Sequence, residues 1–180
     1  MTIRTLTGLI GMLVCVFFFA LNAGASSDPL TPGSAALPHE ETTASILVEI
    51  FLAPDRRGDL DTIKRELADA SITRVRAQFF RLGNPPQNIA VGKNIPAPVA
   101  RLAIRQAVTY NRGIKFLLPQ FRYFPDHIVI GSSAFDEASQ IPISPEDVER
   151  LSDPLLTTPE FHALYRRLTG EDRRLPTYLK

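Results

Sequence analysis

The sequence predicts an α+β fold, in which short strands form a sheet that a few helices cover. Two observations favour this class. Short apolar, β-branched runs alternate with segments whose apolar side chains recur at helical spacing. Some of the predicted strands also follow one another with no helix between them. The length of 180 residues suits one domain, and the 44% apolar and 22% charged content is ordinary for a globular protein.

The first predicted elements lie between residues 46 and 82. Residues 46–52 form an apolar run that ends at a proline, which indicates a largely buried strand. Residues 59–70 carry apolar side chains at helical spacing, and the aspartates near their start suit the first turn of a helix. Residues 73–82 predict a second strand. One of its faces presents Val75, Ala77 and Phe79, and the other presents Arg74, Arg76 and Gln78.

Further elements follow a Gly-Asn-Pro-Pro turn at 83–86. They are a short strand at 88–91, a helix over 97–111, and strands at 114–118 and 127–130. Two short helices come last. Ser144-Pro145 and Thr158-Pro159 open them with a capping hydroxyl and a proline in the first turn, and the second ends near Gly170.

This order resembles the split β-α-β arrangement of ferredoxin-like folds. We therefore expect a small ferredoxin-like sandwich over residues 46–170, with two short C-terminal helices and a polar tail at 171–180. The resemblance implies no function, because unrelated activities occur on this fold.

The N-terminus predicts export. Arg4 precedes an apolar run over 6–21, and Ala23-Gly24-Ala25 matches a cleavage site for a signal peptide spanning 1–25. We expect a secreted or periplasmic protein cleaved near Ala25; an uncleaved N-terminal membrane anchor is the alternative, although the run is short for one. Residues 26–45 contain three prolines and no apolar periodicity, which predicts a disordered leader. The one cysteine, Cys15, lies in the signal segment, so no disulfide is expected.

The basic residues are concentrated in the middle of the chain. Residues 70–125 contain no acidic side chain and nine basic ones, whereas 26–69 and 126–180 carry net charges of −5 and −4. One interpretation is internal pairing between the basic centre and the acidic flanks. The other is a basic surface that holds an anionic polymer or an acidic protein. Nucleic acid is not expected as a partner of an exported protein.

Five arginines are the candidate ligand-binding residues. Arg74 and Arg76 share one strand face, and Arg101, Arg105 and Arg112 follow the spacing i, i+4, i+11 of one helix stripe. Arginine suits this role because its guanidinium makes two parallel bonds to a carboxylate or phosphate. The sequence therefore predicts a binding module rather than an enzyme.

Two alternatives stay open. A small hydrolase could be centred on His127, Ser132 and Asp136, although Gly131-Ser132-Ser133-Ala134 lacks the spacing of a nucleophile elbow. A structural subunit of an envelope assembly is the other alternative. The remaining histidines, His39 and His162, are interpreted as solvated or surface positions.

No metal site and no cofactor are expected. The sequence has no His-x-x-x-His pattern, no cysteine pair and no phosphate-binding glycine loop. Asp55, Asp59 and Asp61 form an acidic cluster, but Arg56 and Arg57 lie within it. We interpret that cluster as a turn followed by the first turn of a helix.

Overall fold

The computed structural model describes residue 43 and residues 45–120 and 124–171. All of them belong to one compact unit, Ala36–Lys180. The predicted signal peptide, most of the leader and most of the polar tail lie outside the described residues.

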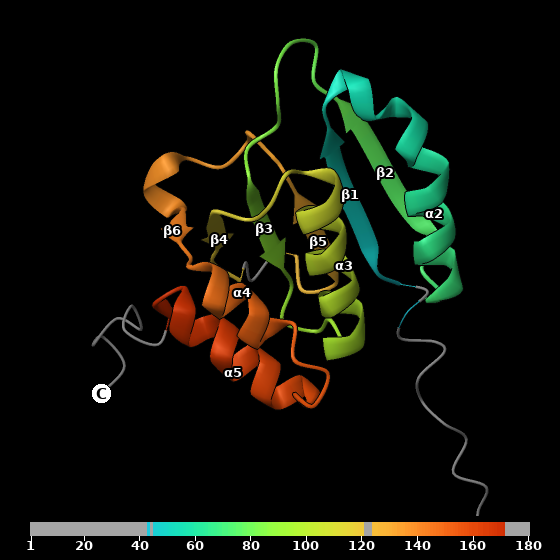
Figure 1. Ribbon diagram of the computed structural model, residues 1–180. Helices are drawn as coiled ribbons and strands as arrows, with labels where there is room; N and C mark the ends of the chain where they lie inside the picture. The colour runs from blue at the N-terminus through green and yellow to red at the C-terminus, as the bar shows by residue number, and fades with distance from the viewer. Residues whose placement is uncertain (1–42, 44, 121–123, 172–180) are drawn as a thin grey trace, which may run out of the picture. The chain divides into compact units, whose positions relative to one another are not determined.

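The described residues form an α+β domain around a mixed sheet of six strands, as the sequence predicted for the class (Figure 1). The spatial order is β2-β1-β5-β3-β4-β6. The strands are β1 (Leu47–Leu52), β2 (Arg74–Phe79), β3 (Asn88–Val91), β4 (Phe116–Leu118), β5 (His127–Ile130) and β6 (Ile141–Pro142). The first five were predicted, β2 from the alternation of its side chains and the other four from short apolar runs; β6 was not, because two residues make no pattern.

The strand order is not that of a ferredoxin-like sandwich. A split β-α-β unit has another strand between its two parallel strands. Here β1 pairs directly with β2 in parallel, and β3 pairs directly with β4 in parallel. β5 lies between the two units, parallel to β1 and antiparallel to β3. The order of the five predicted strands and four predicted helices along the chain is correct, but which edges pair depends on tertiary packing and not on that order.

Four α-helices and two 3₁₀ helices accompany the sheet in the described residues. They are η1 (Pro54–Asp59), α2 (Leu60–Asp69), α3 (Ala97–Tyr110), η2 (Glu137–Ser139), α4 (Pro145–Leu151) and α5 (Thr158–Leu168). Ser144 caps α4 as predicted, because its hydroxyl accepts the Asp147 N–H at 3.2 Å. α5 begins one residue differently: Thr157, not Thr158, is the cap, and its N–H donates to the Glu160 carboxylate at 2.9 Å.

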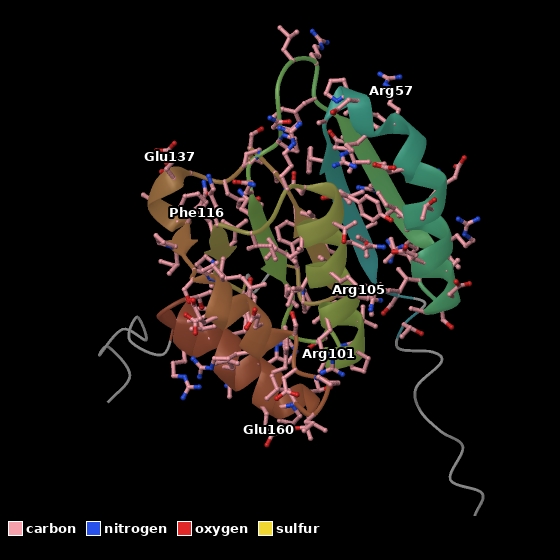
Figure 2. All side chains as sticks on the ribbon, viewed as in Figure 1. Arg57, Arg101, Arg105, Phe116, Glu137 and Glu160 are labelled. Atoms are coloured by element: carbon pink, nitrogen blue, oxygen red, sulfur yellow. The ribbon has the colours of Figure 1, made fainter. Side chains whose placement is uncertain are left out.

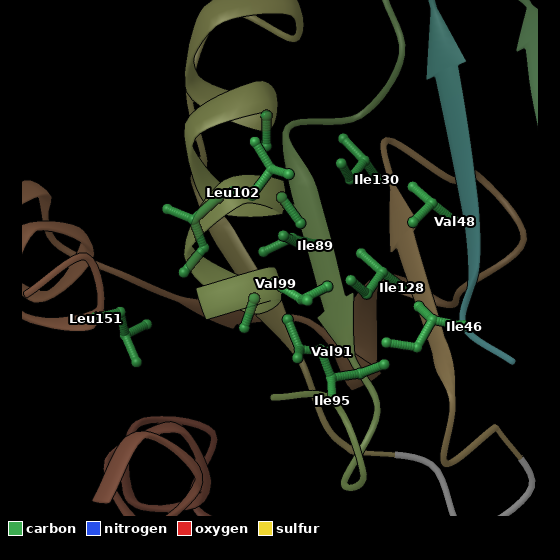
Figure 3. Close-up of a cluster of buried hydrophobic side chains, with 14 of the residues drawn as sticks. Ile46, Val48, Ile89, Val91, Ile95, Val99, Leu102, Ile128, Ile130 and Leu151 are labelled. Atoms are coloured by element: carbon green, nitrogen blue, oxygen red, sulfur yellow. The ribbon is translucent and has the colours of Figure 1, made fainter. Parts of the chain in front are cut away.

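The main core lies between the sheet and the helices (Figure 3). Alternate residues of the central strands point into it, among them Val48, Ile89, Ile128 and Ile130, and α3 supplies Leu102. Burial of these apolar groups is the main stabilising contribution to the fold.

The opposite side of the sheet is here called the helix-free face. Its residues include a second, smaller apolar cluster, further side chains of β1 and β5, and the exposed side of β2. They are Leu47, Glu49, Phe51, Ala90, Leu118, His127, Val129, Arg74, Arg76 and Gln78. The strand register confirms the predicted alternation of β2, with its arginines exposed and its apolar side chains half-buried.

Among the described residues, none of the helices combines the length and the hydropathy required to cross a bilayer.

Candidate functional site

A cavity of about 790 Å³ lies where three loops meet at one end of the sheet. The loops connect β2 to β3, α3 to β4 and β5 to β6. The residues that line it are Asn84, Pro85, Pro86, Gln87, Asn111, Arg112, Lys115, Phe116, Ser133, Phe135, Glu137 and Gln140. We call this cavity the Arg112 cleft.

Hydrogen bonds hold two of these loops against each other. The Asn111 side-chain amide donates to the Pro86 carbonyl at 2.8 Å, and the Gln87 side-chain amide donates to the Arg112 carbonyl. In the other direction, the Lys115 N–H donates to the Gln87 carbonyl at 2.7 Å. The backbone that carries Arg112 and Lys115 is therefore held in place, which lowers the entropic cost of ordering this loop when a ligand binds.

Arg112 is not on a helix stripe, contrary to the prediction. α3 ends at Tyr110, and Arg112 adopts the left-handed conformation with φ 59°. Gly113 follows with φ 106°. A left-handed backbone costs free energy at a residue with a side chain, so the surrounding contacts must hold Arg112 in place. The turn directs the chain away from α3 and places Arg112 beside the cleft.

The cleft contains two cations and one acid. Arg112 lies 3.7 Å from the Asp55 carboxylate, and both side chains are more than half exposed, so water weakens this pair. The other cation, Lys115, is exposed and has no ion pair with any described residue. Glu137 lies on the opposite loop. The lining thus has an excess of positive charge.

The rest of the lining combines amides with aromatic rings. Gln140 is held by Asn88, whose amide donates to the Gln140 side-chain oxygen at 3.2 Å and to the Ser132 carbonyl at 3.0 Å. The Asn88 side-chain oxygen is buried and has no partner among the described residues. Phe116 and Phe135 are half-buried and add apolar surface. Such a lining suits a polar ligand that also has apolar faces.

Arg74 and Arg76 do not line the cleft. They lie on the helix-free face, on the edge strand β2. The Arg76 guanidinium lies 3.3 Å from the Glu49 carboxylate on β1, and Arg74 donates to the Ser45 carbonyl at 2.8 Å. Each contact uses one nitrogen of a group that has five N–H donors. Both arginines therefore keep donors that point to solvent.

Arg101 and Arg105 lie together on α3, on the helix side of the sheet (Figure 2). Arg101 donates to the Leu156 carbonyl at 3.0 Å and so holds the segment between α4 and α5. Arg105 shares a shallow hollow with Glu66 and Asp69 of α2. The five predicted arginines consequently occupy three separate places and do not form one basic surface.

The predicted internal pairing of the basic centre occurs at two arginines, Arg76 and Arg112. Both pair with acids of the N-terminal flank, Glu49 and Asp55. In the described part of the chain, Lys93, Arg105 and Lys115 form no ion pair. The basic centre is thus neutralised only in part by close contacts.

His127 and Ser132 line a second cavity, of about 260 Å³, on the helix-free face. His127 stacks on Phe124 with ring centroids 5.1 Å apart, and the Ser132 hydroxyl accepts the Ala134 N–H at 3.1 Å. β5 separates the two side chains: at about 3.3 Å per residue, its three steps from His127 to Ile130 alone span about 10 Å. Asp136 is exposed and does not line this cavity. No described histidine or acidic side chain forms a hydrogen bond with the Ser132 hydroxyl.

His162 is buried, in contrast to the surface position predicted for it. Its Nε2 donates to the Ile95 carbonyl at 2.8 Å, and Nδ1 accepts from the Gln120 side-chain amide at 2.6 Å. Burial lowers the pKa of His162, and the neighbouring cation Arg166 acts in the same direction. The neutral ring joins α5 to the chain before α3. The neighbouring Phe161 is buried, as expected from its helical spacing, and Tyr165 is buried as well.

Among the described residues there is no group of three or more histidine, cysteine or acidic side chains placed to hold a metal ion.

Sequence patterns did not indicate that Lys115, Gln87, Asn111 and Gln140 belong to a site. They come from three loops, of which only the one between α3 and β4 contributes two, Asn111 and Lys115. The available signals were the Asn-Pro-Pro turn and the Asn-Arg-Gly turn, which mark loops at 84–86 and 111–113. They did not indicate that these loops meet.

No protein-family model matches the chain, and no match was found among the curated proteins or the solved structures.

Proposed function

We propose that this domain is a binding module that holds an anionic polymer in the Arg112 cleft. The observation that carries the proposal is the rigid wall on which Arg112 and Lys115 stand, fixed by the Asn111 and Gln87 hydrogen bonds. A loop that is already held in place loses less freedom when an anionic group binds to the cations that it carries. Of the five arginines predicted from the sequence, Arg112 belongs to this site, and Lys115 is a further cation there.

The lining favours an acidic glycan within the class of anionic polymers. Arg112 and Lys115 would hold carboxylates, of which the guanidinium can bind both oxygens. The side-chain amides of Gln87 and Gln140 offer donors and acceptors for hydroxyl groups. Phe116 supplies an apolar surface against which the face of a sugar ring can pack.

We propose that the chain meets such a polymer outside the cytoplasm, as the signal peptide over 1–25 predicts. Secreted and periplasmic proteins face the polymers of the cell envelope and of the surroundings. The electrostatic part of the binding should weaken with salt, because the cationic side chains of the cleft are exposed.

The test is calorimetric titration of the full chain with an oligogalacturonate, a polymer of uronic acid, and with a neutral galactan as comparison. We expect binding of the oligogalacturonate that falls as salt increases, and no binding of the galactan. Arg112→Gln and Lys115→Gln should each weaken binding by about three- to tenfold, the effect of one partly exposed charged contact. Arg105→Gln is the matched control, because it removes the same charge outside the cleft and should leave binding unchanged.

Two results would overturn the proposal. Equal loss of affinity in Arg105→Gln and Arg112→Gln would mean that the polymer responds only to net charge. Failure of the wild-type chain to bind any carboxylated or sulfated polymer at low salt would remove the anionic ligand altogether.

A further inference from the structure

Within the described residues, strand β2 is an edge of the sheet, and one side of its backbone has no partner strand. It is six residues long, and β1 is its only neighbour among the described strands, since it stands first in the strand order. The Phe80 N–H donates to the Leu52 carbonyl at 3.0 Å, so the even-numbered residues direct their backbone groups toward β1. Hydrogen bonding alternates along a strand, and the N–H and C=O groups of Val75, Ala77 and Phe79 therefore point outward.

Positive charge lines this open edge. Arg74 and Arg76 project from the helix-free face, and both are exposed. At the other end of the strand, the Arg57 guanidinium lies 4.8 Å from the centre of the Phe79 ring. Arg76 pairs with Glu49, whereas Arg57 and Arg74 form no ion pair with any described residue. A segment laid along β2 would thus meet cations on both faces of the sheet.

We propose that β2 binds an extended, acidic segment of a partner protein, which adds a further strand to the sheet. The open N–H and C=O groups of Val75, Ala77 and Phe79 would supply the backbone hydrogen bonds. Acidic side chains at alternate positions of that segment would face Arg74 and Arg76. Strand addition gives affinity through the backbone and selectivity through alternate side chains, and here the selectivity is for negative charge.

A second copy of this chain fits the edge poorly. Two β2 strands paired across a twofold axis would bring the arginines of both copies onto the same face and close to one another. Like charges opposite each other destabilise strand pairs. The arginines therefore disfavour self-association at this edge while they favour an acidic partner.

This site is separate from the Arg112 cleft. None of the residues that line the cleft belongs to β2, and neither Arg74 nor Arg76 lines the cleft. The two proposals can therefore fail independently of each other.

The test uses three synthetic peptides with the full chain. The first alternates glutamate and valine, the second alternates lysine and valine, and the third is the glutamate peptide with N-methyl groups on alternate backbone amides. Binding is measured by fluorescence anisotropy, and the β2 amides are followed by hydrogen exchange with NMR detection. We expect the glutamate peptide alone to bind and to protect the amides of Val75, Ala77 and Phe79 from exchange.

Variants separate charge from backbone pairing. Arg74→Gln with Arg76→Gln should weaken binding of the glutamate peptide by about tenfold. Lys93→Gln with Arg105→Gln, which removes the same charge elsewhere, should leave it unchanged. Oligogalacturonate binding should be unaffected in the Arg74/Arg76 variant, which distinguishes this site from the cleft.

Several outcomes would overturn the inference. Equal binding of the N-methylated peptide would show attraction by charge without strand addition. Protection of amides outside β2 would place the peptide elsewhere. Protection of the β2 amides without peptide, rising with protein concentration, would mean that a second copy occupies the edge.

Discussion

The Tyr165 hydroxyl on α5 donates to the Leu118 carbonyl on β4 at 2.7 Å and accepts the Val91 N–H of β3 at 3.3 Å. Tyr165 is fully buried, and burial raises the pKa of its hydroxyl, so it stays protonated. One side chain thus satisfies backbone groups at the ends of two strands and fixes α5 against them. The cleft wall begins at Phe116, two residues before Leu118 on β4.

Tyr165→Phe should lower the free energy of unfolding by about 1–3 kcal/mol, because buried backbone groups lose their partner while the ring volume is kept. Urea unfolding followed by circular dichroism measures this change. Tyr110→Phe is the control: the Tyr110 hydroxyl donates to Glu66 at 3.3 Å in a less buried place. Equal losses in the two variants would contradict the role given to Tyr165.

Stability should depend on pH through His162. The pKa of His162 is lowered below its ordinary value of 6.5, because burial disfavours the imidazolium. The unfolded chain then takes up a proton at a pH where the folded chain does not. The free energy of unfolding should be fully developed above the unfolded pKa of 6.5 and should fall as pH decreases from there toward the folded pKa.

The slope from this one group can reach about 1.4 kcal/mol per pH unit at most. Urea unfolding of the wild type and of His162→Gln at several pH values between 5 and 7.5 measures the difference, and the carboxylates cancel in that comparison. Parallel curves for the two proteins would show that His162 titrates in the folded state as it does in the unfolded one.

Gly92→Ala should destabilise the domain. A Cβ at Gly92 would overlap the backbone carbonyl oxygens of Phe124 and Pro125, so the loop before β5 would have to move. Overpacking of this kind costs about 1–3 kcal/mol. Gly58→Ala is the control, since a Cβ there meets no atom within 4 Å. It should be neutral or stabilise by up to about 1 kcal/mol through the unfolded state.

Thermal unfolding of the two glycine variants measures both effects. A Gly92→Ala protein as stable as Gly58→Ala would show that the loop carrying Phe124 shifts without cost.

Asp55→Asn should strengthen polymer binding in the cleft. Asp55 competes for Arg112 at 3.7 Å, and its removal leaves that guanidinium free for a ligand carboxylate. Because the pair is exposed, we expect a gain of about two- to fivefold at low salt that shrinks as salt is added. Titration with the oligogalacturonate measures it. Unchanged affinity in Asp55→Asn together with a loss in Arg112→Gln would mean that Asp55 does not engage Arg112 in solution.

Local patterns predicted most of the elements. The apolar runs at 46–52 and 127–130 became β1 and β5, and the periodic segments at 59–70 and 97–111 became α2 and α3 within one or two residues. The 3₁₀ turn η1 was interpreted only as a turn, because six residues with Pro and Gly carry no periodicity. Arg112 was placed on a helix because its spacing fitted one; the helix ends two residues earlier.

By itself, the sequence determined the α+β class, the alternation of β2 and the uneven distribution of charge, because these follow from side-chain type at short range. Only the tertiary structure decided that β1 and β2 pair directly, that Arg74 and Arg101 lie on opposite sides of the sheet, and that His162 is buried. Those outcomes depend on contacts between residues far apart in the chain. The Arg112 cleft also depends on tertiary structure, because its lining residues come from three loops and no single loop supplies all of them.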